Sequence, residues 1–148
     1  MMTEIKTIKC LTIKQPFAGF IMKGFKDKEI RNSNINHRGL IAIHSSKVPD
    51  VEFIKQWGFD VNKFRNGNIL GIAKITGTSR NIDDKWFWMI EPVMEFKKPI
   101  PYSGNLGLWD LNVEVIEKEV IGISLNFLNN ITNPNQLSTN LKPVEIAE

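Results

Sequence analysis

Residues 8–24 read IKCLTIKQPFAGFIMKG, and this stretch predicts a strand that passes directly into a short helix. Its first part, up to Ile13, is apolar and β-branched, which is typical of a buried strand. Pro16 suits the first turn of a helix, because the N–H that proline lacks has no helical partner there. Gly24 can adopt the left-handed conformation that ends a helix. Between them, apolar side chains recur at helical spacing, at Phe17, Phe20 and Ile21.

Short strands separated by turns make up most of the remaining prediction. We expect strands at residues 28–31, 39–44, 69–76, 86–96 and 106–111, and a second helix from Pro49 through Trp57. Pro92 interrupts one strand and marks an edge or a bend, because proline donates no backbone hydrogen bond. Residues 113–128 contain enough apolar residues to form one more strand or helix. The pattern favours an α+β domain, a small curled β-barrel with two or three short flanking helices, over a parallel Rossmann fold.

The charge of the chain is unevenly distributed. The 148 residues carry a net charge of +3, but residues 1–47 contain nine Lys and Arg against three Asp and Glu, while residues 48–148 carry −3. A concentrated positive charge favours an anionic partner, although a lysine-rich solvated surface has the same composition. With 42% hydrophobic and 24% charged residues, the composition is that of an ordinary globular protein.

Cellular location is indicated by the absence of targeting signals and by cysteine usage. No stretch approaches the roughly 20 apolar residues that span a bilayer, and the amino terminus leads into no signal-peptide hydrophobic region. The one cysteine, Cys10, excludes an internal disulfide and fits a reducing compartment. We therefore expect a single-domain cytoplasmic protein with no membrane partner.

Residues suited to metal or nucleophilic chemistry are few. The two histidines, His37 and His44, and the one cysteine form no known metal-ligand spacing, so we expect no metal and no other cofactor. His44 and Ser46 would share a face of a strand, but no nucleophile-elbow motif accompanies them. Neither short glycine cluster resembles the phosphate-binding loop of an ATPase.

Short motifs with polar residues follow one another in a characteristic order. They are Lys14-Gln15-Pro16-Phe17, Gly24-x-Lys26-x-x-Glu29-x-Arg31, Arg38-Gly39, Ile43-His44-x-x-Lys47, Ile69-Leu70-Gly71-Ile72-Ala73 and Pro99-x-Pro101-x-x-Gly104-x-x-Gly107-Leu108-Trp109. Each alone is weak, but the ordered set resembles the ASCH domain, a family named for homology to activating signal cointegrator-1. The resemblance covers residues 8–123 and leaves residues 124–148 as a polar extension.

The resemblance implies a PUA-like β-barrel with a ligand cleft between the first helix and the barrel. The residues that it assigns to ligand binding are Lys14, Gln15, Pro16, Lys26, Glu29, Arg31, Arg38, His44, Lys47 and Trp109, with residues 104–109 as the opposite wall. Basic side chains suit phosphate groups, and arginine can also contact a base edge in a bidentate manner. The amino terminus of a helix attracts anions as well. The expected ligand is RNA, single-stranded DNA or a modified nucleoside in a basic cleft.

Glu29 is the acidic residue among these cations, and it has two interpretations. It orients Lys26 or Arg31 through an ion pair, or it performs acid-base chemistry. Residues three apart on a strand face opposite sides, so a pair between Lys26 and Glu29 requires a turn near Asp27.

Two other functions stay open. Some bacterial ASCH relatives are amidohydrolases that remove acyl groups from N4-acetylcytidine, and others have been linked to ribonuclease activity. A small hydrolase acting on acylated cytidine nucleosides or RNA is therefore the alternative. Those deacylases use a lysine and a threonine three residues later. Lys26 matches the lysine, but Glu29 stands at the threonine position, so the catalytic pair here would be Lys26 with a water-activating Glu29.

The third hypothesis is a protein-interaction domain. It draws on the transcription coactivator for which the family is named. It also draws on the acidic segment 113–148, because the carboxy-terminal extension within it offers a surface for a protein partner.

Overall fold

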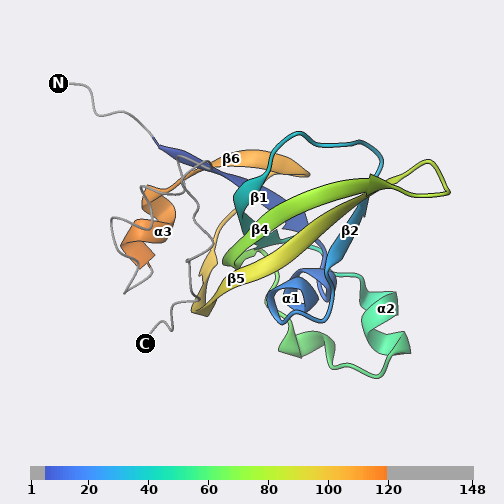
Figure 1. Ribbon diagram of the computed structural model, residues 1–148. Coiled ribbons are helices and arrows are strands. Elements are labelled where there is room, and N and C mark those ends of the chain that lie inside the picture. The colour runs from blue at the N-terminus through green and yellow to red at the C-terminus, as the bar shows by residue number, and fades with distance from the viewer. Residues whose placement is uncertain (1–5, 120–148) are drawn as a thin grey trace.

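The computed structural model describes residues 6–119, and these residues form an α+β domain around one six-stranded mixed sheet (Figure 1). The strands are β1 (Thr7–Ile13), β2 (Lys28–Arg31), β3 (Gly39–Ser45), β4 (Asn68–Arg80), β5 (Trp86–Pro101) and β6 (Leu108–Asn112). The helices are α1 (Phe17–Met22), α2 (Val51–Gln56), α3 (Glu114–Glu119) and the 3₁₀ helix η1 (Val61–Lys63). The α+β class and the short helices are thereby confirmed.

The expected elements are present, with longer strands in the second half of the chain. β4 continues to Arg80 and β5 to Pro101, so the two form a long hairpin that projects beyond the rest of the sheet (Figure 1). Gly24 ends the α1 region with φ +78°, as expected. Residues 113–128 were predicted to form a last strand or helix, and α3 is the part of this segment that the structure describes. The rest of it and the polar extension 124–148 lie outside the described residues.

The sheet has the order β2-β5-β4-β3-β1-β6, in which β1 and β3 are parallel and the other neighbours are antiparallel. β3 lies inside the sheet and is buried at every position. Its side chains alternate between two hydrophobic clusters, because successive residues of a strand point to opposite faces. Leu40 and Ala42 join one cluster, and Ile41 and Ile43 join the other.

The two clusters lie on opposite faces of the sheet and are covered by different helices. The α1-side core contains Ala18, Ile21 and Met22 of α1, whereas the α3-side core contains Ile116 of α3. Figure 1 shows α3 beside β6 and α1 with α2 at another end of the sheet. Within residues 6–119, no helix is long and apolar enough to cross a membrane.

A β-bulge in β5 lets this one strand contribute to both cores. Ala73 of β4 pairs with Pro92, but its neighbour Ile72 pairs with Met94, so Val93 is an extra residue. An extra residue reverses which side chains face which side of a sheet. Trp88 and Ile90 accordingly lie in the α1-side core, and Met94 and Phe96 in the α3-side core. The expected bend at Pro92 is confirmed, in a part of β5 that β2 does not reach.

The sheet curls so strongly that edge strand β2 approaches β1, although three strands separate them in the sheet order. The guanidinium Nη2 of Arg31 on β2 donates to the carbonyl oxygen of Thr12 on β1 at 2.9 Å. No backbone ladder joins these two strands within the described part of the chain. A side chain therefore bridges the gap that a closed barrel would fill with a ladder.

We predict that Gly71→Ala destabilises the domain, because a Cβ at this position of β4 would overlap the carbonyl oxygen of Met94 and lie 2.7 Å from Met22 Cε. Overpacking of this kind costs roughly 1–3 kcal/mol of the free energy of unfolding, which urea denaturation measures. Gly77→Ala is the matched control, since that position on the same strand is open. Equal stability of the two variants would contradict the predicted overlap.

Candidate functional site

Two exposed lysines lie where the parallel strands β1 and β3 end. Lys14 follows β1 and Lys47 follows β3, and both strands end at the same edge because they are parallel. The two ends are joined, since the Ser46 N–H donates to the carbonyl oxygen of Ile13 at 2.9 Å. The sequence motifs of these lysines are therefore adjacent in space.

Glu29 binds two cations at the start of β2. Its Oε2 accepts a hydrogen bond from Arg31 Nη2 at 2.9 Å, and its Oε1 lies 3.9 Å from Lys26 Nζ. Glu29 and Arg31 share a face because they are two residues apart on a strand. The strand begins at Lys28, and Lys26 precedes it. The alternation of side chains along a strand therefore does not keep Lys26 and Glu29 on opposite faces. The Glu29 side chain is 13% exposed and engaged on both oxygens.

Arg31 and Lys26 also lie over aromatic rings. The Arg31 guanidinium is 5.8 Å from the ring of Trp88, and its Nε is buried without a partner among the described residues. Lys26 Nζ is 5.6 Å from the ring of Phe17, the first residue of α1. Phe17 begins the helix that follows Lys14, so Lys26 lies over the start of the segment that continues from β1. We call Lys14, Lys26, Arg31 and Lys47 the basic corner.

Gln15 and Pro16 lie beneath this corner as structural residues. Both are buried, and Pro16 is the N-cap of α1. The Gln15 side chain accepts from the Gly19 N–H at 2.8 Å and donates to the Arg65 carbonyl at 3.0 Å. Gln15 thus satisfies a free N–H of the first turn, which the N-cap proline cannot do. The Gln15 side chain therefore supports α1 through these two hydrogen bonds.

His44 and Trp109 meet at the hydroxyl of Thr12, away from the basic corner. Thr12 Oγ1 lies 3.1 Å from His44 Nδ1 and accepts from Trp109 Nε1 at 2.9 Å, and it donates to the Asn105 carbonyl at 2.5 Å. His44 Nε2 donates to the Tyr102 carbonyl at 2.7 Å. Burial lowers the pKa of His44, and the bond to Tyr102 opposes that shift. These polar groups therefore stabilise the fold through one another.

The structure does not bring Trp109 opposite the basic corner. Trp109 packs in the α3-side core, whereas Trp88 beneath Arg31 belongs to the α1-side core. Gly104 is pressed against Trp109 and His44, since a Cβ there would lie 2.7 Å from both rings. Of the residues expected to form a second wall of the ligand cleft, Trp109 completes the α3-side core, Leu108 packs against the α1-side core and Leu106 is 89% exposed.

Arg38 lies at the other end of β3 from Lys47. Its guanidinium donates to the carbonyl oxygens of Ile35 and His37 and to Thr78 Oγ1 on β4, at 2.8 to 3.0 Å. These bonds hold the loop that precedes β3 against the hairpin. The structure gives Arg38 a role in the loop and does not place it in the basic corner.

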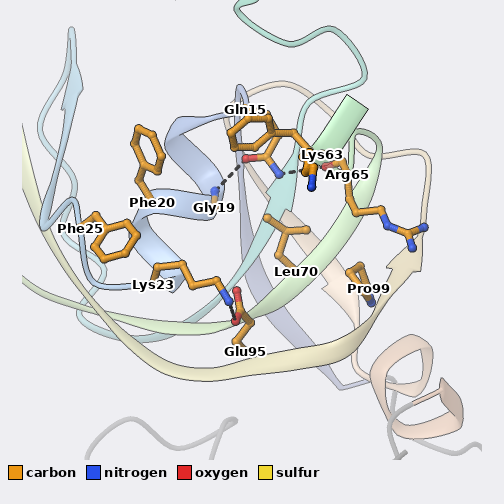
Figure 2. A pocket seen from close by; sticks show the side chains of 11 residues that line it. Gln15, Gly19, Phe20, Lys23, Phe25, Lys63, Arg65, Leu70, Glu95 and Pro99 are labelled. Carbon is orange, nitrogen blue, oxygen red and sulfur yellow. Dashed lines mark hydrogen bonds and ion pairs between the residues drawn. The ribbon is translucent and has the colours of Figure 1, made fainter. Parts of the chain in front are cut away.

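A cleft of about 310 Å³ lies next to α1, and the sequence motifs missed most of it. Of the expected site residues, only Gln15 lines it. Figure 2 shows Phe20, Phe25 and Lys23 on the α1 side of the cleft and Arg65 with Pro99 across from them. The signal that could have found it is Lys63-Phe64-Arg65, because alternating cations and aromatics are typical of anion-binding and base-binding surfaces.

The described residues offer neither an exposed thiol nor a cluster of metal ligands. Cys10 is completely buried, and burial raises the pKa of its thiol, which disfavours the nucleophilic thiolate. Within residues 6–119, no group of three or more His, Cys, Asp or Glu could hold a metal ion.

Neither protein-family models nor curated proteins match this chain. The family resemblance therefore stays a prediction that rests on motif order. The structure is an α+β domain with a basic corner and an aromatic-lined cleft.

We predict that Thr12→Val destabilises the domain more than Thr12→Ser. Valine keeps the shape but removes the hydroxyl, which leaves His44, Trp109 and the Asn105 carbonyl without this partner. Buried polar groups left unsatisfied cost roughly 1–3 kcal/mol, whereas serine keeps the hydroxyl and loses one methyl group, about 1 kcal/mol. Chemical denaturation of the two variants measures the difference. A larger loss for serine would mean that methyl packing outweighs the hydrogen bonds.

Proposed function

We propose that this protein binds RNA, single-stranded DNA or a nucleoside through the basic corner. The observation that carries the proposal is the meeting of Lys14 and Lys47 at the joined ends of β1 and β3, with Lys26 over the first ring of α1. The uneven charge of the sequence supports it, because most of the positive excess lies in residues 1–47. Phosphate oxygens are the ligands that such surface cations contact most often.

The acidic residues near the basic corner offset only part of its charge, since Glu29 pairs with Lys26 and Arg31 and leaves Lys14 and Lys47 unpaired among the described residues. Glu29 is engaged by Arg31, and Asp50 caps α2 by accepting from the Phe53 N–H at 3.1 Å. The side chains of Lys14 and Lys47 have no ion-pair or hydrogen-bond partner within residues 6–119. Two exposed cations at one edge thus stay available for an anion.

Glu29 acts in this proposal as a positioning residue. It lies between Lys26 and Arg31, so its charge orients both cations. A general base needs an oxygen that can reach the proton of a substrate, and both Glu29 oxygens already face cations. The pairing supports a binding protein over the alternative hydrolase.

The curled sheet supports a proposal about the family as well. We infer an ASCH domain of PUA-like architecture, in which Arg31 bridges the gap between β1 and β2. The motif order of residues 8–123 and the strand-to-helix passage from β1 to α1 are in keeping with it. The completely buried free thiol of Cys10 suits the reducing cytoplasm that we propose as its location.

We predict salt-dependent binding of short single-stranded RNA and DNA, measured by fluorescence anisotropy. Lys14→Ala and Lys47→Ala should each weaken binding. Each should also reduce the slope of log affinity against log salt concentration by about 0.7, the value for one phosphate contact to a single strand. Lys118→Ala is the matched control, because Lys118 lies on α3, which covers the α3-side core. No binding of RNA, DNA or nucleosides by the wild-type protein at low salt would refute the proposal.

One further variant, Glu29→Gln, separates binding from catalysis. We expect no release of acetate from N4-acetylcytidine by the wild type. Acetate release that disappears in Glu29→Gln, while the affinity for nucleic acid is kept, would establish the hydrolase instead.

A further inference from the structure

Seven aromatic rings form a continuous network over α1, α2 and η1, outside the basic corner. We call this network the aromatic ridge; its members are Phe17, Phe20, Phe25, Phe53, Trp57, Phe59 and Phe64. Phe20 is central, with the rings of Phe25, Phe59 and Phe64 at 5.8 to 6.5 Å between centroids. Phe17 connects Phe20 to Phe53 and, beyond it, to Trp57. The network runs along one surface because neighbouring rings come from neighbouring elements.

Two of these rings are too exposed for packing to explain them, and a third is almost half exposed. Phe25 is 78% exposed, Trp57 65% and Phe59 46%. A side chain that leaves most of its surface in water contributes little burial to stability. Several large exposed aromatics on one surface are instead typical of a binding site. Phe17 and Phe53, which are half-buried, pack α2 against α1 with their ring centroids 4.8 Å apart.

The cleft opens beside this ridge and shares residues with it. Phe20, Phe25 and Phe64 belong to both, and Leu70 of β4 lies between the two sides of the cleft in Figure 2. A volume of about 310 Å³ is at the lower end of the range for small-molecule sites, roughly 300–1,000 Å³. Its size and aromatic lining suit one flat ring system.

The charges around the cleft favour an anionic ligand. Lys23 Nζ pairs with Glu95 Oε1 at 2.5 Å, so these two charges cancel. Lys63 and Arg65, on the opposite side, are exposed, and their side chains have no polar partner within the described residues. The cleft thus combines aromatic rings with two uncompensated positive charges.

We propose that the aromatic ridge and the cleft bind the bases of a single-stranded nucleic acid, while Lys63 and Arg65 contact its phosphates. This inference rests on the proposed function and deepens it, since it makes the ligand a strand and not a free nucleoside. Lys26 lies over Phe17, and the Phe17 ring is 6.4 Å from that of Phe20, so the basic corner and the cleft are joined by the ridge. Stacking on aromatic rings holds single strands without regard to sequence.

The test uses a labelled short oligothymidine and variants at exposed positions, which leave both cores intact. Phe25→Ala and Trp57→Ala should each lower the affinity roughly five- to 100-fold, the loss expected when one stacked base is released. Ile82→Ala is the matched control, because Ile82 is 98% exposed in the turn between β4 and β5, away from the ridge. Circular dichroism checks that each variant is folded.

A second comparison separates base stacking from charge. An abasic strand of the same length should bind about tenfold more weakly or worse, because it keeps the phosphates and lacks the stacking bases. Arg65→Ala and Lys63→Ala should weaken binding of the intact strand and reduce its salt slope, whereas Lys118→Ala should not. Binding should also quench the fluorescence of Trp57, and this quenching should be lost in Trp57→Phe.

The outcomes distinguish this inference from the proposed function. If Lys14→Ala weakens binding but Phe25→Ala and Arg65→Ala do not, the inference fails and the proposed function stands. If the abasic strand binds as well as the intact strand, stacking is excluded. If the wild type binds no strand at all, both fail. Binding to anionic lipid vesicles but to no strand would assign the ridge to a lipid surface and overturn the inference.

Discussion

The hydrogen bonds of Thr12 join edge strand β2 to β1, which no β-ladder connects among the described residues, and they reinforce the ladders of β1 with β3 and β6. Its carbonyl accepts from Arg31 of edge strand β2, which no ladder joins to β1 among residues 6–119. On the other face, its hydroxyl meets Trp109 of β6 and His44 of β3. The orientation of the basic corner follows from this residue, because Arg31 fixes Glu29 and Glu29 in turn lies beside Lys26. A single position on β1 therefore couples the α3-side core to the charged surface.

Sequence reasoning succeeded where local spacing decides the outcome. Alternating and β-branched segments gave the strands, and Pro92 marked the bend in β5. The contact of Glu29 with Arg31 follows from their separation of two residues on a strand, which needs no tertiary information. These features depend on neighbours in the chain, so they could be read directly.

The same reasoning could not tell which polar motif residues face a ligand and which face the interior. Gln15 and His44 are satisfied by backbone carbonyls 50 and 58 residues away in the sequence, and no local pattern encodes those partners. The cleft was missed for a related reason. Arg65 lies outside every predicted helix and strand, and its relation to Phe25 arises only when η1 packs on α1.

The extra residue Val93 has a consequence for how this chain can vary in length. The bulge reverses which side chains of β5 point to which face of the sheet. The buried residues before the bulge therefore pack in one core and those after it in the other. Loss or gain of one residue between Ile90 and Met94 would turn the buried side chains of one half outwards, and conservative replacement could not compensate. The turn at residues 81–85 carries no such constraint, since Ile82 there is almost fully exposed. Homologous chains should therefore differ in length at the tip of this hairpin and keep a constant spacing along β5.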